Sequence, residues 1–240
     1  MTSNEQFVKE ALGRTAVFFG LSEEALERLA PLFLEKTYQK DQTLFRQGEQ
    51  GEALVVIVSG QVTVEKEIID GRRVTLALRG PGAVLGEMAL LDGAARSASV
   101  YALESTTCLA LDRGSFYRFL AQHSKALQGL LMVLCQRLRE SDRKVEDLGS
   151  KTLLQRLAGA LLELAQAEGT TTGQGVELSS VVNYQLLTGL LCTNRESVSR
   201  AARELRAMGL LAKNGRKFLL ADLQGLSDLY LKRPHSTLLT

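Results

Sequence analysis

The chain has 240 residues, of which 45% are hydrophobic and 23% charged, as in ordinary soluble globular proteins. This length suits one or two domains, and no apolar run reaches the roughly 18 residues that a membrane-spanning helix needs. The first residues lack the basic and apolar stretches of a signal peptide, so the sequence predicts a cytoplasmic protein with no membrane contact.

The formal net charge of +2 is unevenly distributed. Residues 151–240 carry 11 Lys and Arg against 7 Asp and Glu, whereas residues 1–150 have a net charge of −2. A basic C-terminal part favours a polyanionic partner. Cys108, Cys135 and Cys192 are scattered without metal-ligand spacing, which predicts buried thiols, no disulfide framework and no metal.

The N-terminal half begins with a predicted helix and continues as short strands. Residues 22–34 have helical spacing, with Ser22 as the N-cap. Residues 53–58 form an uninterrupted apolar run, and residues 62–68 and 74–78 alternate on either side of the hairpin signal Asp70-Gly71. Short strands separated by glycines predict a β-sandwich or jelly roll over residues 37–111.

A glycine-rich segment at residues 80–98 interrupts these strands. It contains Gly86-Glu87-Met88-Ala89 and then Arg96-Ser97-Ala98. An Arg makes bidentate contacts to a phosphate, N–H groups at the start of a short helix add donors, and a carboxylate accepts from a sugar hydroxyl. The segment therefore predicts a small phosphate-containing ligand, with a plain glycine-rich turn and a surface ion pair as the alternative.

Residues 113–147 form a predicted long helix with a heptad pattern. Apolar residues recur at alternating spacings of four and three, apart from one serine: Leu127, Leu131, Leu134, Leu138, Ser141, Val145 and Leu148. Such a seam favours a parallel homodimer with closed two-fold symmetry. The alternative is a single long helix that packs against its own domain.

The C-terminal part predicts a winged helix. A hinge at Gly149-Ser150 and a helix over residues 153–167 are followed by a loop or hairpin at residues 169–175. Two helices, over residues 183–191 and 195–208, flank a tight turn that ends at the N-cap Asn194. A hairpin over residues 210–220 then turns at Asn214-Gly215.

The second helix of this pair has two contrasting faces. Val198, Ala202 and Leu205 would pack inward, and the opposite side carries Arg195, Glu196, Ser199 and Arg200. A recognition helix enters the major groove in this way, with Arg reading guanine and Glu accepting from cytosine. Lys213, Arg216 and Lys217 flank the hairpin tip and suit phosphates. A solvated charged face and a plain basic turn are the alternatives.

From about residue 15 to 230 the chain resembles the bacterial CRP/FNR family of transcription regulators, especially its cAMP receptor branch. Four features carry the resemblance, in the family's order: Gln47-Gly48-Glu49, the segment at residues 80–98, the long helix, and residues 194–200. The resemblance implies an α+β chain. Its expected parts are a cyclic-nucleotide-binding jelly roll at 1–112, a dimerisation helix at 113–149 and a DNA-binding winged helix-turn-helix at 150–240.

The resemblance also implies roles for individual residues. Gly86, Glu87 and Met88 would contact ribose and phosphate, and Arg96 and Ser97 would hold the cyclic phosphate. Arg137 lies at the position of a family Arg near the nucleotide. Ser141 and Asp142 lie where the family brings the purine to the dimer helices, and Asp142 departs from the serine of the best-known relative. Arg195, Glu196 and Arg200 match the family's base-reading positions.

The function implied is a cAMP-responsive homodimer that binds a palindromic operator in double-stranded DNA, with RNA polymerase as a further partner and no enzymatic activity. Within the family, a regulator that works without a nucleotide or senses another signal is the alternative. An iron–sulfur sensor is disfavoured because no cysteine precedes Cys108. A cyclic-nucleotide-binding module of an enzyme or channel would leave the winged helix unexplained.

Overall fold

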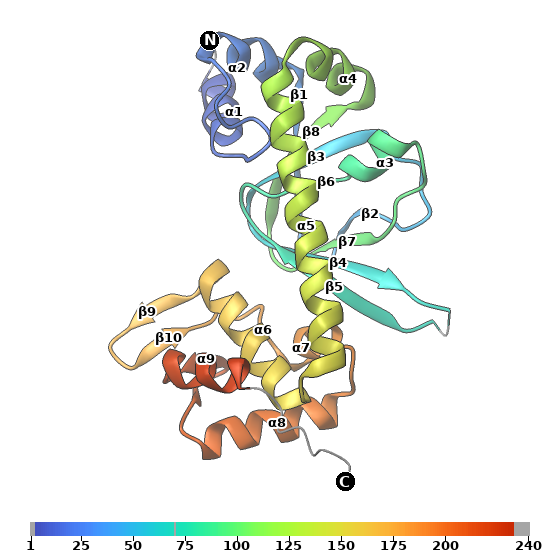
Figure 1. The fold of residues 1–240 in the computed structure, drawn as a ribbon. Helices are drawn as coiled ribbons and strands as arrows, with labels where there is room; N and C mark the ends of the chain where they lie inside the picture. The colour runs from blue at the N-terminus through green and yellow to red at the C-terminus, as the bar shows by residue number, and fades with distance from the viewer. Residues whose placement is uncertain (1–2, 70, 233–240) are drawn as a thin grey trace. The chain divides into compact units, whose positions relative to one another are not determined.

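The structure is a computed structural model that describes residues 3–69 and 71–232 (Figure 1). It divides into two compact units, Met1–Arg139 and Glu140–Thr240. The predicted boundaries at 112/113 and 149/150 differ from this division, which falls inside a long helix, and they stay predictions. Asp70, at the tip of the predicted hairpin, lies outside the described residues.

The first unit is built on two four-stranded antiparallel sheets, which confirms the predicted jelly-roll architecture. One sheet has the order β1-β8-β3-β6 and the other the order β2-β7-β4-β5. In chain order the strands are β1 (Phe33–Tyr38), β2 (Thr43–Phe45), β3 (Ala53–Ser59), β4 (Val62–Glu67), β5 (Arg73–Arg79), β6 (Val84–Leu85), β7 (Ser99–Ala102) and β8 (Thr106–Asp112).

Strand β3 is buried on both faces, and this explains its uninterrupted apolar run. Successive side chains of a strand point to opposite faces. Val55 and Ile57 belong to the core between the two sheets, whereas Leu54 and Val56 belong to the core beneath the helices. A strand at the centre of a three-layer arrangement therefore has no polar face.

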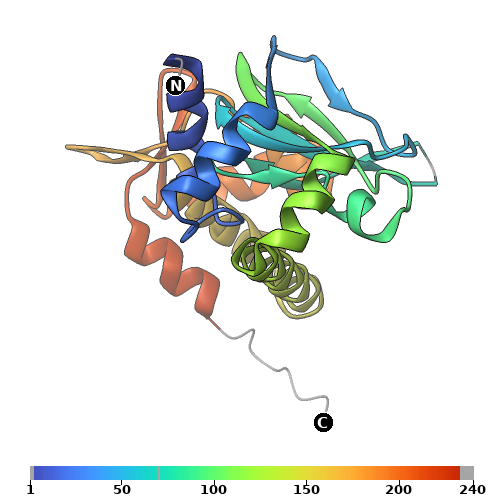
Figure 2. The ribbon, with the colours of Figure 1, turned by 90° about the horizontal axis from the view of Figure 1, so that it is seen from above.

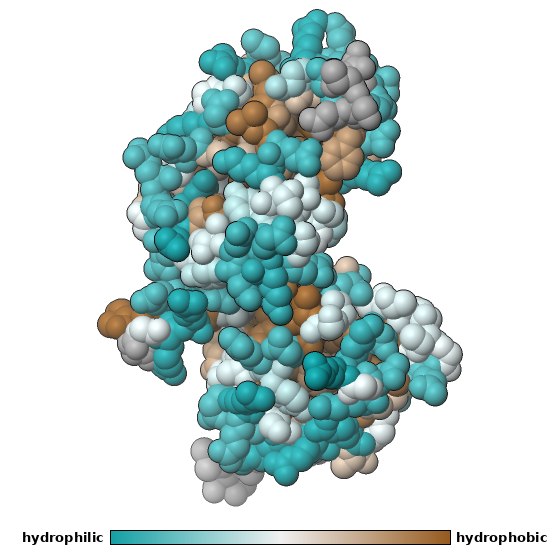
Figure 3. Space-filling model, turned by 180° about the vertical axis from the view of Figure 1, so that it is seen from behind, coloured by the Kyte–Doolittle hydropathy of each residue, from teal (hydrophilic) through white to brown (hydrophobic). Residues whose placement is uncertain are grey.

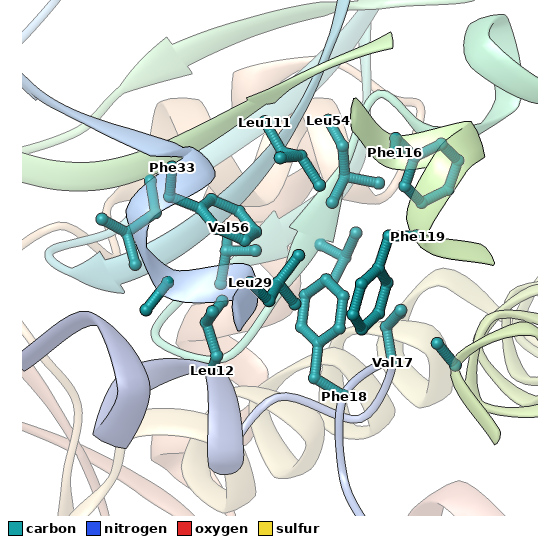
Figure 4. Packing of buried hydrophobic residues seen from close by; sticks show 14 of the residues in the cluster. Leu12, Val17, Phe18, Leu29, Phe33, Leu54, Val56, Leu111, Phe116 and Phe119 are labelled. Carbon is teal, nitrogen blue, oxygen red and sulfur yellow. The ribbon is translucent and has the colours of Figure 1, made fainter. Parts of the chain in front are cut away.

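Helices α1 (Ser3–Gly13), α2 (Glu23–Leu29) and α4 (Arg113–Gln122) cover this second core. Phe18 lies at its centre, with ring centroids 5.9 Å from Phe33 and 6.1 Å from Phe119 in edge-on arrangements (Figure 4). Ser22 caps α2 as predicted, by accepting from the Ala25 N–H. The helix expected up to residue 34 is shorter, because a 3-10 turn, η1 (Ala30–Leu32), contains Pro31 and leads into β1.

The long helix α5 (Ser124–Ser150) starts later than residue 113, where the sequence predicted the start of the dimerisation helix. The backbone leaves helical geometry at His123, with φ −131° and ψ 87°, and the His123 ring stacks on Phe119 at 4.3 Å. From there α5 runs without interruption, and Figure 2 looks almost along it. Its seam leaves large apolar side chains exposed in the single chain, including Leu131, Leu138 and Val145.

The second unit has the predicted winged-helix topology. Its elements are α6 (Leu153–Glu168), β9 (Thr170–Thr172), β10 (Gly175–Glu177), α7 (Tyr184–Leu190), α8 (Arg195–Ala207), β11 (Leu211–Asn214), β12 (Lys217–Leu220) and α9 (Leu223–Leu231). The four strands form an antiparallel sheet in the order β11-β12-β10-β9. The last helix, α9, has no counterpart in the sequence-based prediction.

Polar residues dominate the face drawn in Figure 3, and apolar residues reach that surface in separate patches. Among the described residues, no helix is both long enough and apolar enough to cross a membrane. The prediction of buried thiols is correct for Cys108, whose pKa burial raises to about 12, and wrong for Cys135 and Cys192, which are exposed. Cys135 lies on the exposed part of α5 and Cys192 in the turn before α8, so neither reaches a core.

Candidate functional site

A pocket in the first unit brings together most of the predicted ligand-binding residues. The pocket lies between strands of both sheets, the short helix α3 (Glu87–Asp92) and Arg137 of α5. The predicted residues that line it are Gly86, Glu87, Met88, Arg96, Ser97 and Arg137. Their roles toward a ligand stay predictions, but the fold does place them around one cavity.

Arg96 is held in this pocket by the backbone. Its side chain donates to the carbonyl oxygens of Gly86 at 2.8 Å and Ala53 at 2.7 Å. The residue is only 6% exposed, and its guanidinium carbon lies 4.2 Å from the ring centroid of Phe45. Burial lowers the pKa of Arg96, and the nearby carboxylates of Glu87 and Glu49 oppose that shift. A guanidinium held this way would lose little conformational entropy on binding an anion.

Gly86 has to be glycine for two reasons. Its φ of +83° lies in the left-handed region, and a Cβ there would stand 2.1 Å from Arg96 Nη1. The Arg96 guanidinium occupies the space that a side chain at position 86 would need.

The Glu87 carboxylate is fully buried and paired with Arg137. One carboxylate oxygen accepts from Arg137, whose guanidinium also donates to the Val84 carbonyl. The buried charge of Glu87 is thereby compensated, as a carboxylate without exposure requires. This pair joins α5 to the pocket within the first unit.

Two polar atoms of the pocket have no protein partner. Within the described part of the chain, Glu87 Oε2 and Arg96 Nε are buried and make no hydrogen bond. The first can only accept and the second can only donate. A ligand that offers a hydroxyl donor and an anionic acceptor would satisfy both, and a ribose with a phosphate has these groups.

Ser141 and Asp142 belong to the second unit, where both are exposed on α5. Sequence reasoning missed two neighbours of Arg96: the Phe45 ring and the Ala53 carbonyl. No signal in the sequence identifies them, because both contacts depend on strands that meet only in the folded sandwich.

The second candidate site is the outer face of α8. Asn194 caps this helix as predicted, by accepting from the Ser197 N–H at 2.9 Å. Val198, Ala202 and Leu205 are buried as expected, together with Ala201. The opposite side exposes four charged residues: Arg195, Glu196, Arg200 and Arg203. Ser199 lies on the same side and is half-buried.

Two charged residues on this face pair with each other. Arg200 Nη2 lies 3.5 Å from Glu196 Oε1, and both side chains are largely exposed. Such an exposed pair costs little to break, so both groups remain available to a partner. Arg203 was missed by sequence reasoning, although it lies three residues after Arg200 and the helical period places it on the same side.

The wing carries the three predicted basic residues in different environments. Lys213 and Arg216 are exposed, and the Lys213 ammonium lies 5.7 Å from the ring centroid of Tyr184. Lys217 instead donates to Glu177 at 2.6 Å, and Asn214 donates to the other oxygen of the same carboxylate. These two donors lower the pKa of Glu177. The Lys217 charge is therefore shared with a protein carboxylate.

Comparison with known proteins identifies the class to which this chain belongs. The family model for the cyclic nucleotide-binding domain matches residues 35–123, and the model for the Crp-like helix-turn-helix domain matches residues 155–229. A nucleotide-binding jelly roll followed by a helix-turn-helix defines a class of ligand-responsive DNA-binding proteins.

Relatives and solved structures agree. The cyclic AMP receptor protein of Thermus thermophilus is 34% identical over 81% of this chain and 87% of its own length. A CRP-like cAMP-activated global transcriptional regulator of Mycobacterium tuberculosis is 28% identical over 91% of this chain and 97% of its own. The structure of FixK2 from Bradyrhizobium japonicum matches with a TM-score of 0.74 and 26% identity, over 84% of this chain and 99% of that chain.

The chain belongs to the CRP/FNR family of transcription regulators. It is a DNA-binding transcription regulator with a cyclic-nucleotide-binding domain, and its family consists of regulators rather than enzymes.

Proposed function

We propose that this regulator is a homodimer whose binding to a palindromic operator depends on a cyclic nucleotide, with cAMP as the effector. The observation that carries the proposal is the pair of unpartnered atoms in the pocket, Glu87 Oε2 and Arg96 Nε. Buried polar atoms in native proteins nearly always have partners, so this pair calls for a ligand with a donor and an acceptor.

Each pocket residue has a place in this proposal. Arg96 and Ser97 hold the cyclic phosphate, and Glu87 accepts from the ribose hydroxyl while Arg137 keeps its charge compensated. Gly86 and Met88 bring backbone and apolar contacts to the same side. Ser141 and Asp142 meet the purine where two copies of α5 pair.

The names of relatives support cAMP without deciding it. The Thermus and Mycobacterium relatives are named for cAMP. A structural neighbour from Xanthomonas campestris, with a TM-score of 0.72 and 25% identity, is titled a c-di-GMP responsive regulator. Effector choice therefore differs among proteins of this fold.

We also propose that α5 forms the dimer, since its exposed apolar seam is a surface that a second copy covers with two-fold symmetry. The DNA contacts then come in two sets: Arg195, Glu196, Ser199 and Arg200 reach base edges, and Lys213, Arg216 and Lys217 reach phosphates. Because its partners would be chromosomal DNA and RNA polymerase, we place the protein in the cytoplasm.

The test is calorimetry with cAMP, cGMP and c-di-GMP, followed by fluorescence anisotropy on operator DNA with and without each nucleotide. Arg96→Ala should weaken cAMP binding at least tenfold, which is about 1.4 kcal/mol. It should also lower the melting temperature, because Arg96 donates to two buried carbonyls. Arg46→Ala, at an exposed position, is the control and should bind cAMP as the wild type does. A wild-type protein that binds none of the three nucleotides would refute the effector assignment.

A second candidate is a regulator that binds DNA without a nucleotide. The specific observation in its favour is that protein groups already engage the pocket charges, Arg137 with Glu87 and Arg96 with two carbonyls. Nucleotide-free protein, verified by its absorbance ratio, would then bind the operator with full affinity, and added cAMP would change nothing.

A further inference from the structure

The C-terminal helix α9 packs against α6 through an aromatic ring. Tyr230 lies over Gly159, where an added Cβ would stand 2.6 Å from the Tyr230 Cε2 atom. The ring therefore rests directly on the backbone of α6. This close approach fixes the position of α9 along α6, because any larger residue at position 159 would push the two helices apart.

The same tyrosine reaches the end of α5. Its hydroxyl lies 3.0 Å from an oxygen of Asp147, in the last turns of that helix. Asp147 also pairs with Lys151, whose ammonium lies 3.9 Å from the centroid of the Tyr230 ring. The Asp147 and Lys151 side chains are 22% and 17% exposed, so the cluster is largely shielded from water. Three side chains thus link α5, the residue after it and α9.

A second link holds the same C-terminal end of α9. Gln155 is buried and completes the capping box of α6, with its oxygen accepting from the Thr152 N–H at 3.0 Å. Its amide nitrogen donates to the carbonyls of Leu229 and Lys232. The last carbonyls of a helix lack donors of their own, and Gln155 supplies one. One side chain therefore joins the start of α6 to the end of α9.

These contacts surround the joint between α5 and α6. Only Lys151 and Thr152 separate the two helices, and Thr152 is extended, with φ −65° and ψ 160°. A two-residue connector leaves few torsions to set the angle at which α6 leaves α5. Side-chain contacts across the connector decide how well that angle is defined.

We propose that α9 is a clamp on this joint and that Tyr230 is its positioning residue. The proposal rests on the proposed function, in which α5 forms the dimer and α8 reads DNA. With the angle fixed, the recognition helices of the two subunits meet two half-sites at once. A loose joint would lower the effective concentration of the second helix at its half-site without changing any contact to DNA.

The test compares a palindromic operator with a single half-site, both selected by the wild-type protein from random duplexes. Tyr230→Phe keeps the ring on Gly159 and removes only the hydroxyl. Asp147→Asn weakens the acceptor of that hydroxyl, because it replaces the carboxylate with a neutral amide. Each should lose at least fivefold in affinity for the palindrome and stay within twofold of the wild type on the half-site. The double variant should lose no more affinity than Asp147→Asn alone, because Asp147→Asn already weakens the hydrogen bond that Tyr230→Phe removes.

Asp228→Asn is the matched control, since Asp228 is exposed on α9 and pairs only within that helix among the described residues. It should behave as the wild type on both duplexes. Amide hydrogen exchange over residues 148–155 should be faster in Tyr230→Phe and Asp147→Asn than in the wild type and the control.

Two results would overturn the clamp: variants that bind the palindrome as the wild type does, or variants that lose affinity for both duplexes equally. If the wild-type protein bound the palindrome no more tightly than the half-site, the proposed dimeric function would be refuted instead. In that case hydrogen exchange decides the clamp alone, and unchanged exchange over residues 148–155 in Tyr230→Phe overturns it.

Discussion

The Arg96 guanidinium fills the space beside the Gly86 α-carbon. Arg96 Nη1 donates to the Gly86 carbonyl at 2.8 Å, and a Cβ on Gly86 would stand 2.1 Å from that nitrogen. The position of the cation and the absence of a side chain are therefore one structural feature. It predicts the consequence of adding a single methyl group.

Gly86→Ala should displace Arg96 and weaken cAMP binding at least tenfold in calorimetry. Gly93→Ala is a matched control, because Gly93 also has a positive φ, of +71°, but its added Cβ would meet Arg113 at an ordinary 3.7 Å. Both variants should lose about 1 kcal/mol of stability from backbone strain. Equal nucleotide affinity in the two variants would show that the Gly86–Arg96 contact does not shape the site.

Leu138→Asp should convert the dimer to a monomer in sedimentation velocity at micromolar concentration. Leu138 is 63% exposed in the single chain, so its replacement does not disturb the core, but in the proposed dimer it would bury two like charges in an apolar seam. Met132→Asp is the control, because Met132 is 66% exposed on the same helix and lies outside the heptad positions. A dimeric Leu138→Asp variant would place the interface elsewhere.

Arg200→Ala should relax the preference for one guanine in each half-site, at a cost of about 1–3 kcal/mol per contact. Arg216→Ala should weaken binding to all sequences alike and lower the salt slope by about one for each phosphate that the protein no longer neutralises. Competition among single-base operator variants at fixed salt separates the two effects. An even loss across all variants for Arg200→Ala would make that residue a phosphate-binding residue.

The wing should be sensitive to acid through Glu177. Hydrogen bonds from Lys217 and Asn214 lower the pKa of Glu177 below its usual 4.5. A carboxylate whose pKa is lowered by folding adds stability above its unfolded pKa and loses it as the pH falls through the folded value. As the pH falls from 6 through the pKa of Glu177, the free energy of unfolding in urea should therefore decrease more steeply in the wild type than in Glu177→Gln. Lys217→Met should flatten the profile in the same way, and a wild-type slope in both variants would contradict this account.

Much of the fold follows from local sequence signals. The N-caps Ser22 and Asn194 and the hairpin at Asn214-Gly215 act within a few residues, and the structure has them where the sequence places them. The failures have equally local causes. Pro31 sits in a 3-10 turn that leads into a strand, and His123 leaves helical geometry where its ring stacks on Phe119. Sequence reasoning missed helix α9, although Asp222 caps it by accepting from the Gly225 N–H.

The sequence by itself determined the order of the two modules and the residue types of both sites, because spacing along one helix or one turn fixes which side chains share a face. Only the tertiary structure decided what those side chains contact. In the folded chain the Phe45 ring stacks against Arg96, Lys217 pairs with Glu177, and the Tyr230 hydroxyl contacts Asp147. Contacts between strands and helices far apart in the chain depend on how layers pack, and that packing leaves no periodic trace in the sequence.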